Sequence, residues 1–240
     1  MPFAFGFSCL ILFAAVTAAC RPDVPCAHVP RCDSGKLAIL EDFKVSNVPG
    51  IVPAKQSTSV RICYDQEGFK LNTIATDSNI FSPYTQCNSE VWVNSDVLEV
   101  FMAPVQDATQ NPIWYHETDT SASGAVWAGH INNTKGNWSN CNDISCTPGP
   151  LPCTGLGDFD SLPGLHAHVT NYTEGWRNQL SIPFELFPKE YATGKFWRAN
   201  FYRYDYPWGD KVNYELSGWS PTHDPSFHIP ARFGVLVLDE

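Results

Sequence analysis

The chain has 240 residues and a net charge of −10, and its lysines and arginines form no cluster. Phosphate groups of nucleic acids would repel such a chain, so we set nucleic acids aside as partners, and the same repulsion disfavours anionic membrane surfaces. Aromatic residues make up 13% of the sequence, so either the core or a binding surface must be rich in aromatic rings.

The N-terminal segment predicts secretion. Residues 1–19 carry no charged side chain and run through an apolar stretch into Thr17-Ala18-Ala19, which is typical of a signal peptide cut before Cys20. The apolar stretch is shorter than the ~20 residues that a membrane-spanning helix needs. We therefore expect a secreted protein with no membrane span. Three N-x-S/T sequons are candidate glycosylation sites: Asn132, Asn137 and Asn171.

Cysteine usage agrees with an oxidising compartment. Eight cysteines follow the signal segment: Cys20, Cys26, Cys32, Cys63, Cys87, Cys141, Cys146 and Cys153. An even count in a secreted chain predicts up to four disulfides, and the sequence does not decide their pairing. A zinc site at Cys141, Cys146 and Cys153 is the alternative that we favour less, because paired C-x-x-C knuckles are missing.

In chain order, residues 20–35 form a short arm rich in cysteine and proline, which we expect disulfides to hold against the rest. Residues 36–240 are expected to form one domain. Within it, short apolar segments rich in β-branched and aromatic residues predict strands at 59–64, 70–76, 97–103, 124–131, 165–170, 176–182, 196–204 and 233–238. Only residues 183–191 could make a helical turn. This spacing predicts an all-β fold: a single antiparallel β-sandwich, jelly-roll or immunoglobulin-like, stapled by disulfides.

Alternation within the predicted strands places charges among apolar residues. Glu99 shares one face of its strand with Val97 and Phe101, and Arg203 shares a face with Phe201. A charge in such a row must be paired, hydrogen-bonded or at the edge of a groove.

Five motifs then occur in a fixed order. They are D-x-x-E-x-F-x-x-P at residues 96–104, G-W-x-x-x-x-x-I-P-F at 175–184, W-R-x-N-x-x-R at 197–203, W-S-P-T at 219–222 and F-H-x-P-x-x-F-G at 227–234. In this order they resemble the carbohydrate-binding module family 9-like domain, within the DOMON-like superfamily of β-sandwiches. The resemblance covers residues 36–240.

The resemblance implies a non-catalytic sandwich that binds a polysaccharide or oligosaccharide. The apolar face of a sugar ring packs on Trp or Tyr, and its hydroxyls need fixed polar partners. The candidate ligand-binding residues are Trp219, Trp92, Asp96, Glu99, Asn200, Tyr202 and Arg203. Trp219 is the leading candidate, because its G-W-S-P context predicts an exposed loop. The resemblance also allows a calcium ion, although no loop has a recognisable calcium-ligand spacing. We expect a monomer.

Structural roles compete with these functional ones. We favour a buried ion pair between Glu99 and Arg203 over a part in binding, and Asp96 could stabilise a turn. Three-residue spacing puts Asp96 and Glu99 on opposite faces of a regular strand, so only a turn or a bulge would unite them.

Three rival functions remain open. The first is an extracellular structural or cell-wall protein whose sugar site has decayed. The second is a haem-binding electron-transfer domain of the DOMON type, in which Met102, the only methionine after the signal segment, would be a candidate axial ligand. The third is a small glycosidase, which would need two carboxylates ~5–10 Å apart across a cleft.

Overall fold

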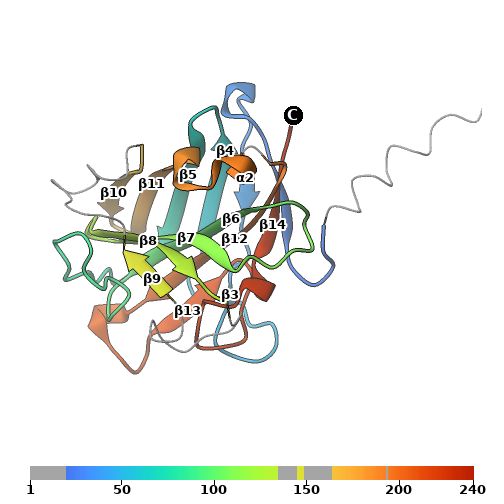
Figure 1. Ribbon diagram of the computed structural model, residues 1–240. Coiled ribbons are helices and arrows are strands. Elements are labelled where there is room, and N and C mark those ends of the chain that lie inside the picture. Colours follow the sequence, from blue (N-terminus) through green and yellow to red (C-terminus); the bar gives the residue numbers. More distant parts are fainter. Residues whose placement is uncertain (1–19, 135–144, 149–163, 193) are drawn as a thin grey trace, which may run out of the picture.

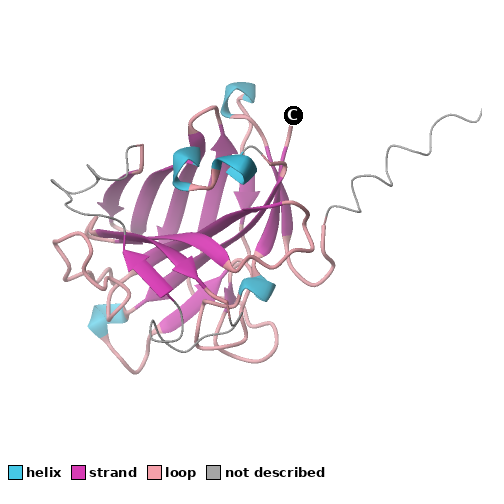
Figure 2. Cartoon of the chain, in the orientation of Figure 1, coloured by secondary structure: helices cyan, strands magenta, loops and turns pink. Residues whose placement is uncertain are grey.

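The computed structural model describes residues 20–134, 145–148, 164–192 and 194–240. Two β-sheets pack face to face, and the few helices are short (Figures 1 and 2). The expected all-β sandwich is therefore confirmed. No helix among the described residues is long and apolar enough to cross a membrane.

The larger sheet has the strand order β1-β14-β12-β6-β7-β8-β9, and β13 pairs with both β12 and β3. Its strands are β1 (Cys26–Val29), β3 (Lys44–Val45), β6 (Val97–Val105), β7 (Trp114–Ser121), β8 (Val126–Asn132), β9 (Ser145–Pro148), β12 (Phe196–Asp205), β13 (Glu215–Gly218) and β14 (Gly234–Leu238). These strands pair antiparallel except β1 with β14, which run parallel.

The smaller sheet has the order β10-β11-β5-β4-β2 and is antiparallel throughout. Its strands are β2 (Ala38–Leu40), β4 (Thr58–Tyr64), β5 (Gly68–Thr76), β10 (His166–Tyr172) and β11 (Gly175–Pro183). The helical pieces are η1 (Cys32–Ser34), η2 (Phe184–Leu186), α2 (Lys189–Ala192), η3 (Pro207–Gly209) and η4 (Pro230–Arg232). Of these, η2 and α2 confirm the helical turn expected within residues 183–191.

The predicted strands match the observed ones to within two residues at each end. The principal strand that the sequence did not reveal is β7. Its sequence, WYHETDTS, is polar at positions that face inward, so it lacks the apolar alternation that marks a half-buried strand. Nevertheless His116, Thr118 and Thr120 are buried, because β7 lies between β6 and β8 in the middle of the sheet.

The larger sheet is covered on both faces. On its inner face, Val100, Met102 and Phe201 pack against residues of the smaller sheet such as Ile62 and Phe69. The outer face carries a second buried cluster, which includes Phe101, Tyr115, Trp127, Tyr202 and Phe233. Alternate residues of the 96–104 segment therefore face two different buried clusters, one between the sheets and one on the outer face of the larger sheet.

The N-terminal arm is held as expected. A disulfide joins Cys32 to Cys63 on β4, and another closes Cys20 to Cys26 within the arm. Cys87 is also disulfide-bonded. Beyond what was expected, the arm supplies β1 and thereby extends the larger sheet.

Several sequence predictions fall on parts of the chain outside the described residues. They are the signal segment at 1–19, the sequon at Asn137, and the side chains of Cys141, Cys146 and Cys153, with the zinc alternative that they carry. Asn132 on β8 and Asn171 on β10 are exposed, and their glycosylation stays a prediction.

Candidate functional site

The register of four neighbouring strands builds one row across the outer face of the larger sheet. Glu99 on β6 lies opposite Tyr202 on β12 and opposite Asp119 on β7, and Asp119 lies opposite Trp127 on β8. Directly opposed residues in a sheet project to the same face, with Cβ atoms about 5 Å apart. The row therefore sets two carboxyl groups between two aromatic rings.

The carboxyl groups of this row are buried and close together. Oxygens of Glu99, Glu117 and Asp119 all lie within 4.8 Å of one another, and Glu99 and Asp119 are 2% and 0% exposed. Burial raises the pKa of both Glu99 and Asp119 well above the ordinary range, and the negative charge of Asp119 raises the pKa of Glu99 further. Both Asp119 oxygens and Glu99 Oε1 are buried without a hydrogen-bond partner among the described residues. Burial and the closeness of the two groups both favour the protonated form, because two neighbouring buried carboxylates repel each other.

No countercharge offsets the pair within the described residues. No lysine or arginine there forms an ion pair with Glu99 or Asp119 or lowers the pKa of either group. Buried carboxyl groups are usually paired or bind a cation or ligand, because desolvating a charge costs several kcal/mol. The pair is therefore the feature of this face that most needs a functional explanation.

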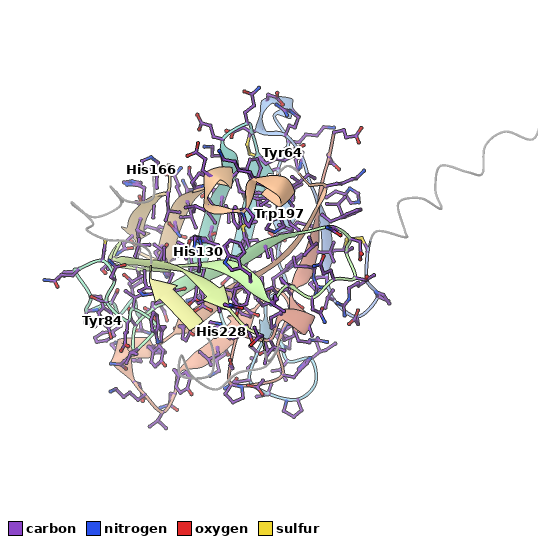
Figure 3. The ribbon with its side chains drawn as sticks, viewed as in Figure 1. Tyr64, Tyr84, His130, His166, Trp197 and His228 are labelled. Atoms are coloured by element: carbon purple, nitrogen blue, oxygen red, sulfur yellow. A yellow bond between two sulfur atoms is a disulfide. The ribbon has the colours of Figure 1, made fainter. Side chains whose placement is uncertain are left out.

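Aromatic rings extend the row toward solvent. Trp92 packs edge-on against Trp127, with ring centroids 5.4 Å apart and planes at 85°. Trp127 is buried, whereas Trp92 is partly exposed. The Tyr84 hydroxyl donates to the Val93 carbonyl over 2.6 Å and so holds the segment that carries Trp92. Figure 3 shows Tyr84 and His228 on the side of the molecule opposite Tyr64.

The rest of this face is filled by internal contacts. Asn200 Nδ2 donates to the Tyr202 hydroxyl over 2.6 Å and to the Ser220 carbonyl over 2.7 Å, while the Tyr202 ring stacks on Phe227 at 4.0 Å. Asn200 and Tyr202 are both fully buried. Asn200 and Tyr202 thus hold the segment that follows β13 in place. Their contact with a ligand stays a prediction.

A neutral histidine also lies here. His228 Nδ1 is 2.7 Å from the Tyr115 hydroxyl, and its ring packs on Phe101. Burial lowers the pKa of His228 to about 3, so the ring is uncharged at neutral pH. The 3.9 Å separation between His228 Nε2 and Glu117 Oε2 is therefore not an ion pair.

The predicted ion pair between Glu99 and Arg203 is wrong. Arg203 lies opposite Leu98, one residue out of step with Glu99, so the two side chains leave opposite faces of the sheet. Arg203 Nη2 instead lies 3.1 Å from Asp77 Oδ2 and 3.6 Å from Asp205 Oδ2. Arg203 is therefore not beside the carboxyl row, and this structure gives it no route to a ligand there.

Asp96 belongs to the acidic cluster of Asp77 and Asp205 rather than to the row. One of its carboxylate oxygens accepts the backbone N–H of Tyr206 over 2.7 Å, and the other accepts that of Phe81. This confirms the turn-stabilising alternative for Asp96. Asp96 and Glu99 lie in two different acidic clusters, as the three-residue spacing indicated.

The expectation that Trp219 is exposed is also wrong. Trp219 is only 9% exposed, and its ring packs edge-on against Phe201 in the core between the sheets. It occupies the space that a side chain at Gly234 would need. A ring in this position cannot stack on a sugar without leaving the core, because β13 ends at Gly218 and turns Trp219 inward. Of the two candidate tryptophans, Trp92 is the one that is partly exposed.

The two acidic clusters differ in their fitness for calcium. Arg203 already forms ion pairs with Asp77 and Asp205, and Asp96 already accepts two backbone N–H groups. Glu99, Glu117 and Asp119 offer oxygen atoms alone, which are the ligands that calcium prefers. The second cluster therefore fits a calcium ion and the first does not.

Comparison with known proteins finds solved structures of similar fold but no matching sequence family. No protein-family model matches the sequence, and no curated protein matches it. Among solved structures, a Bacteroides uniformis protein described only provisionally as carbohydrate-binding is similar with a TM-score of 0.65 and 16% identity, over 90% of this chain and 99% of that one. A family 9 carbohydrate-binding module from Caldicellulosiruptor kristjanssonii, solved with cellotriose, is similar with a TM-score of 0.50 and 11% identity, over 89% of this chain and 93% of that one.

The chain shares the fold of these carbohydrate-binding sandwiches. This confirms the fold that the five sequence motifs implied. At such low identity the likeness concerns the fold alone, so the site must be argued from the residues of this chain.

Proposed function

We propose that the chain binds carbohydrate without catalysis, on the outer face of its larger sheet. The observation that carries this proposal is the buried Glu99–Asp119 carboxyl pair, whose oxygens lie within 4.8 Å of each other, set beside Trp127 and Trp92. A carboxyl pair accepts and donates hydrogen bonds, as sugar hydroxyls require, and the indole rings offer the apolar contact that a pyranose face requires.

The exposure of these residues suggests how a sugar would reach them. Trp92 is partly exposed, whereas Glu99 and Asp119 are buried. Trp127 connects them, since it packs on Trp92 and lies opposite Asp119. A sugar ring would contact Trp92 and direct a hydroxyl inward to the carboxyl pair. Hydroxyl donors would then satisfy oxygens whose burial is otherwise costly, by about 1–3 kcal/mol for each unsatisfied group.

The spacing of the acids supports binding rather than hydrolysis. Glycosidases hold two carboxyl groups apart, on either side of the scissile bond, by ~5–10 Å. Glu99 and Asp119 lie directly opposite each other on adjacent strands, and their carboxyl oxygens lie within 4.8 Å of one another. They project side by side from one face of the sheet, which fits one wall of a binding site better than the two sides of a scissile bond.

The fold agrees with this proposal, since the similar structures include a module solved with cellotriose. We also propose, from the sequence, that the chain is secreted and acts as a monomer. The ligand class that we propose is a polysaccharide or its oligosaccharides.

Titration calorimetry of the oxidised protein against β-glucan and xylan oligosaccharides tests the proposal. We expect saturable binding that Glu99→Gln, Asp119→Asn and Trp92→Ala each weaken at least tenfold. Tyr172→Ala is the matched control, because Tyr172 is a partly exposed aromatic residue on β10 of the other sheet. Equal affinity in all four variants would place the sugar elsewhere.

The same titrations in calcium and in EDTA test the metal. If Glu99, Glu117 and Asp119 hold calcium when sugar binds, EDTA should weaken binding by the wild type but leave Glu99→Gln unchanged. If no sugar binds under any condition, the chain is better explained as an extracellular structural protein with a decayed site.

A further inference from the structure

The inner face of the larger sheet carries a second row of polar side chains, separate from the carboxyl row. His116 on β7 lies opposite Met102 on β6 and opposite His130 on β8. Met102 and His116 are 0% and 1% exposed, and His130 is partly exposed. Two imidazoles and a thioether therefore project side by side from three adjacent strands into the space between the sheets.

In each imidazole, one ring nitrogen has a hydrogen-bond partner and the other has none among the described residues. His116 Nε2 lies 2.9 Å from Thr118 Oγ1, while its Nδ1 is buried and has no hydrogen-bond partner among the described residues. His130 donates a ring N–H to the Leu186 carbonyl, while its Nε2 is buried and likewise has no partner in the described part of the chain. The Leu186 bond must use Nδ1–H, so Nε2 of His130 carries the lone pair.

The two rings are neighbours and are uncharged. Their centroids are 5.3 Å apart, with planes at 66°. Burial lowers the pKa of His116 to about 3 and lowers the pKa of His130, so both present neutral imidazole at physiological pH. Neutral imidazole whose other nitrogen is fixed by a backbone carbonyl or side-chain oxygen is the usual form of a metal-binding histidine.

Aromatic packing explains the ring positions but not these nitrogens. Trp114 and Phe187 pack around the two histidines, with centroids 4.9 Å from His130 and 5.8 Å from His116 respectively. An apolar residue would fill the same space without leaving a buried nitrogen unsatisfied. Two such nitrogens on directly opposed residues point to a shared ligand.

We propose that His116 Nδ1 and His130 Nε2, together with the Met102 thioether, form a binding site for a copper(I) ion. Thioether and imidazole are donors that favour copper(I), whereas calcium and magnesium prefer oxygen. A single positive charge is also easier to bury among neutral ligands than a double one. Thr118 and Leu186 are then positioning residues that fix the two ring tautomers.

The site has an entrance. His130 and its neighbour Trp114 are partly exposed, so an ion could enter from the β8 side and reach His116 behind them. In Figure 3 His130 lies near the middle of the molecule, below the short helices η2 and α2, of which η2 contains Leu186. The site is on the opposite face of the sheet from the carboxyl row, so it does not depend on the proposed sugar binding.

The test is competition for copper(I) against the chromogenic chelator bicinchoninate, without oxygen, on the full oxidised chain. We expect the wild type to withdraw one equivalent of copper(I). His116→Gln, His130→Gln and Met102→Leu should each lose roughly tenfold or more in affinity, as should Thr118→Val through its hydrogen bond to His116. His168→Gln is the matched control, because His168 is exposed on β10.

Thermal unfolding separates a lost site from a lost fold. An ion that binds only the native state raises the unfolding temperature, so copper(I) should stabilise the wild type and His168→Gln but not His116→Gln or His130→Gln. X-ray absorption should show a sulfur ligand that Met102→Leu removes. The proposal is overturned if the wild type leaves copper(I) with the chelator, if folded His116→Gln retains full affinity, or if the sulfur signal survives Met102→Leu.

Discussion

Arg203 Nη2 lies 3.1 Å from Asp77 Oδ2, and the two side chains are 1% and 0% exposed. Arg203 is on β12 of the larger sheet, whereas Asp77 directly follows β5 of the smaller one. The ion pair therefore joins the two sheets at one end of the sandwich. Asp205 Oδ2 also lies 3.6 Å from Arg203 Nη2, and Asp96 lies beside both aspartates.

Removing either member of this pair should destabilise the fold strongly. We expect Arg203→Met and Asp77→Asn each to lower the free energy of unfolding by about 3–5 kcal/mol, because each leaves a buried charge without its partner. Urea denaturation of the single and double variants measures the coupling. The coupling energy between Arg203 and Asp77 should exceed about 1 kcal/mol, whereas the losses of stability from substituting Arg203 and Glu99 should be additive. Strong coupling to Glu99 instead would contradict the register described here.

Asp96 should make stability depend on pH. Burial raises its pKa to about 7, and the negative charges of Asp77 and Asp205 contribute, against an unfolded value of about 3.9. Because the folded state holds the proton more tightly, this contribution is complete below about pH 4 and is lost as pH rises through about 7.

Neutral His116 and His228 make the free energy of unfolding change with pH in the opposite direction over the same range. The measurement therefore compares the pH dependence of the wild type with that of Asp96→Asn, both in EDTA. Between pH 5 and pH 8 the wild type should lose roughly 2–3 kcal/mol relative to Asp96→Asn. A difference that is constant with pH, or that grows in favour of the wild type, would show that Asp96 is ionised throughout.

Trp219→Ala should damage the fold rather than a binding surface. We expect a loss of about 3–5 kcal/mol in the free energy of unfolding, since a large ring leaves a cavity between the sheets. Trp208→Ala serves as the control, because Trp208 is 76% exposed and should change stability by less than about 0.5 kcal/mol. Similar unfolding midpoints for the two variants would mean that Trp219 lies outside the core.

The two described disulfides should differ in their effect on stability. The Cys32–Cys63 bridge closes 31 residues and the Cys20–Cys26 bridge closes 6. Chain entropy predicts losses of about 4 and about 2 kcal/mol respectively on replacing each pair by serine. Denaturation of the two double variants checks the order, and a larger loss from the Cys20–Cys26 replacement would show that strand β1, rather than loop closure, dominates.

The sequence alone determined the all-β class, the positions of eight strands and the two faces of β6, because period-two alternation and β-branched residues act locally. It also identified Glu99 and Arg203 as charges in apolar rows. It did not identify their partners, because Asp119 and Asp77 depend on which strands are neighbours and in which register. Since a one-residue offset moves a side chain to the opposite face of a sheet, only the tertiary structure could separate Glu99 from Arg203.

The same reason explains the other differences. A G-W-S-P loop can point outward or inward, and the packing of Trp219 on Phe201 decides this only once β12 and β13 are paired. The polar sequence of β7 concealed a central strand, because its burial comes from pairing with β6 and β8, which the local sequence does not indicate. The carboxyl row and the imidazole row each take their residues from neighbouring strands among β6, β7 and β8. Neither proposed site can therefore be recognised from one segment of the sequence, because each forms only when these strands pair in this register.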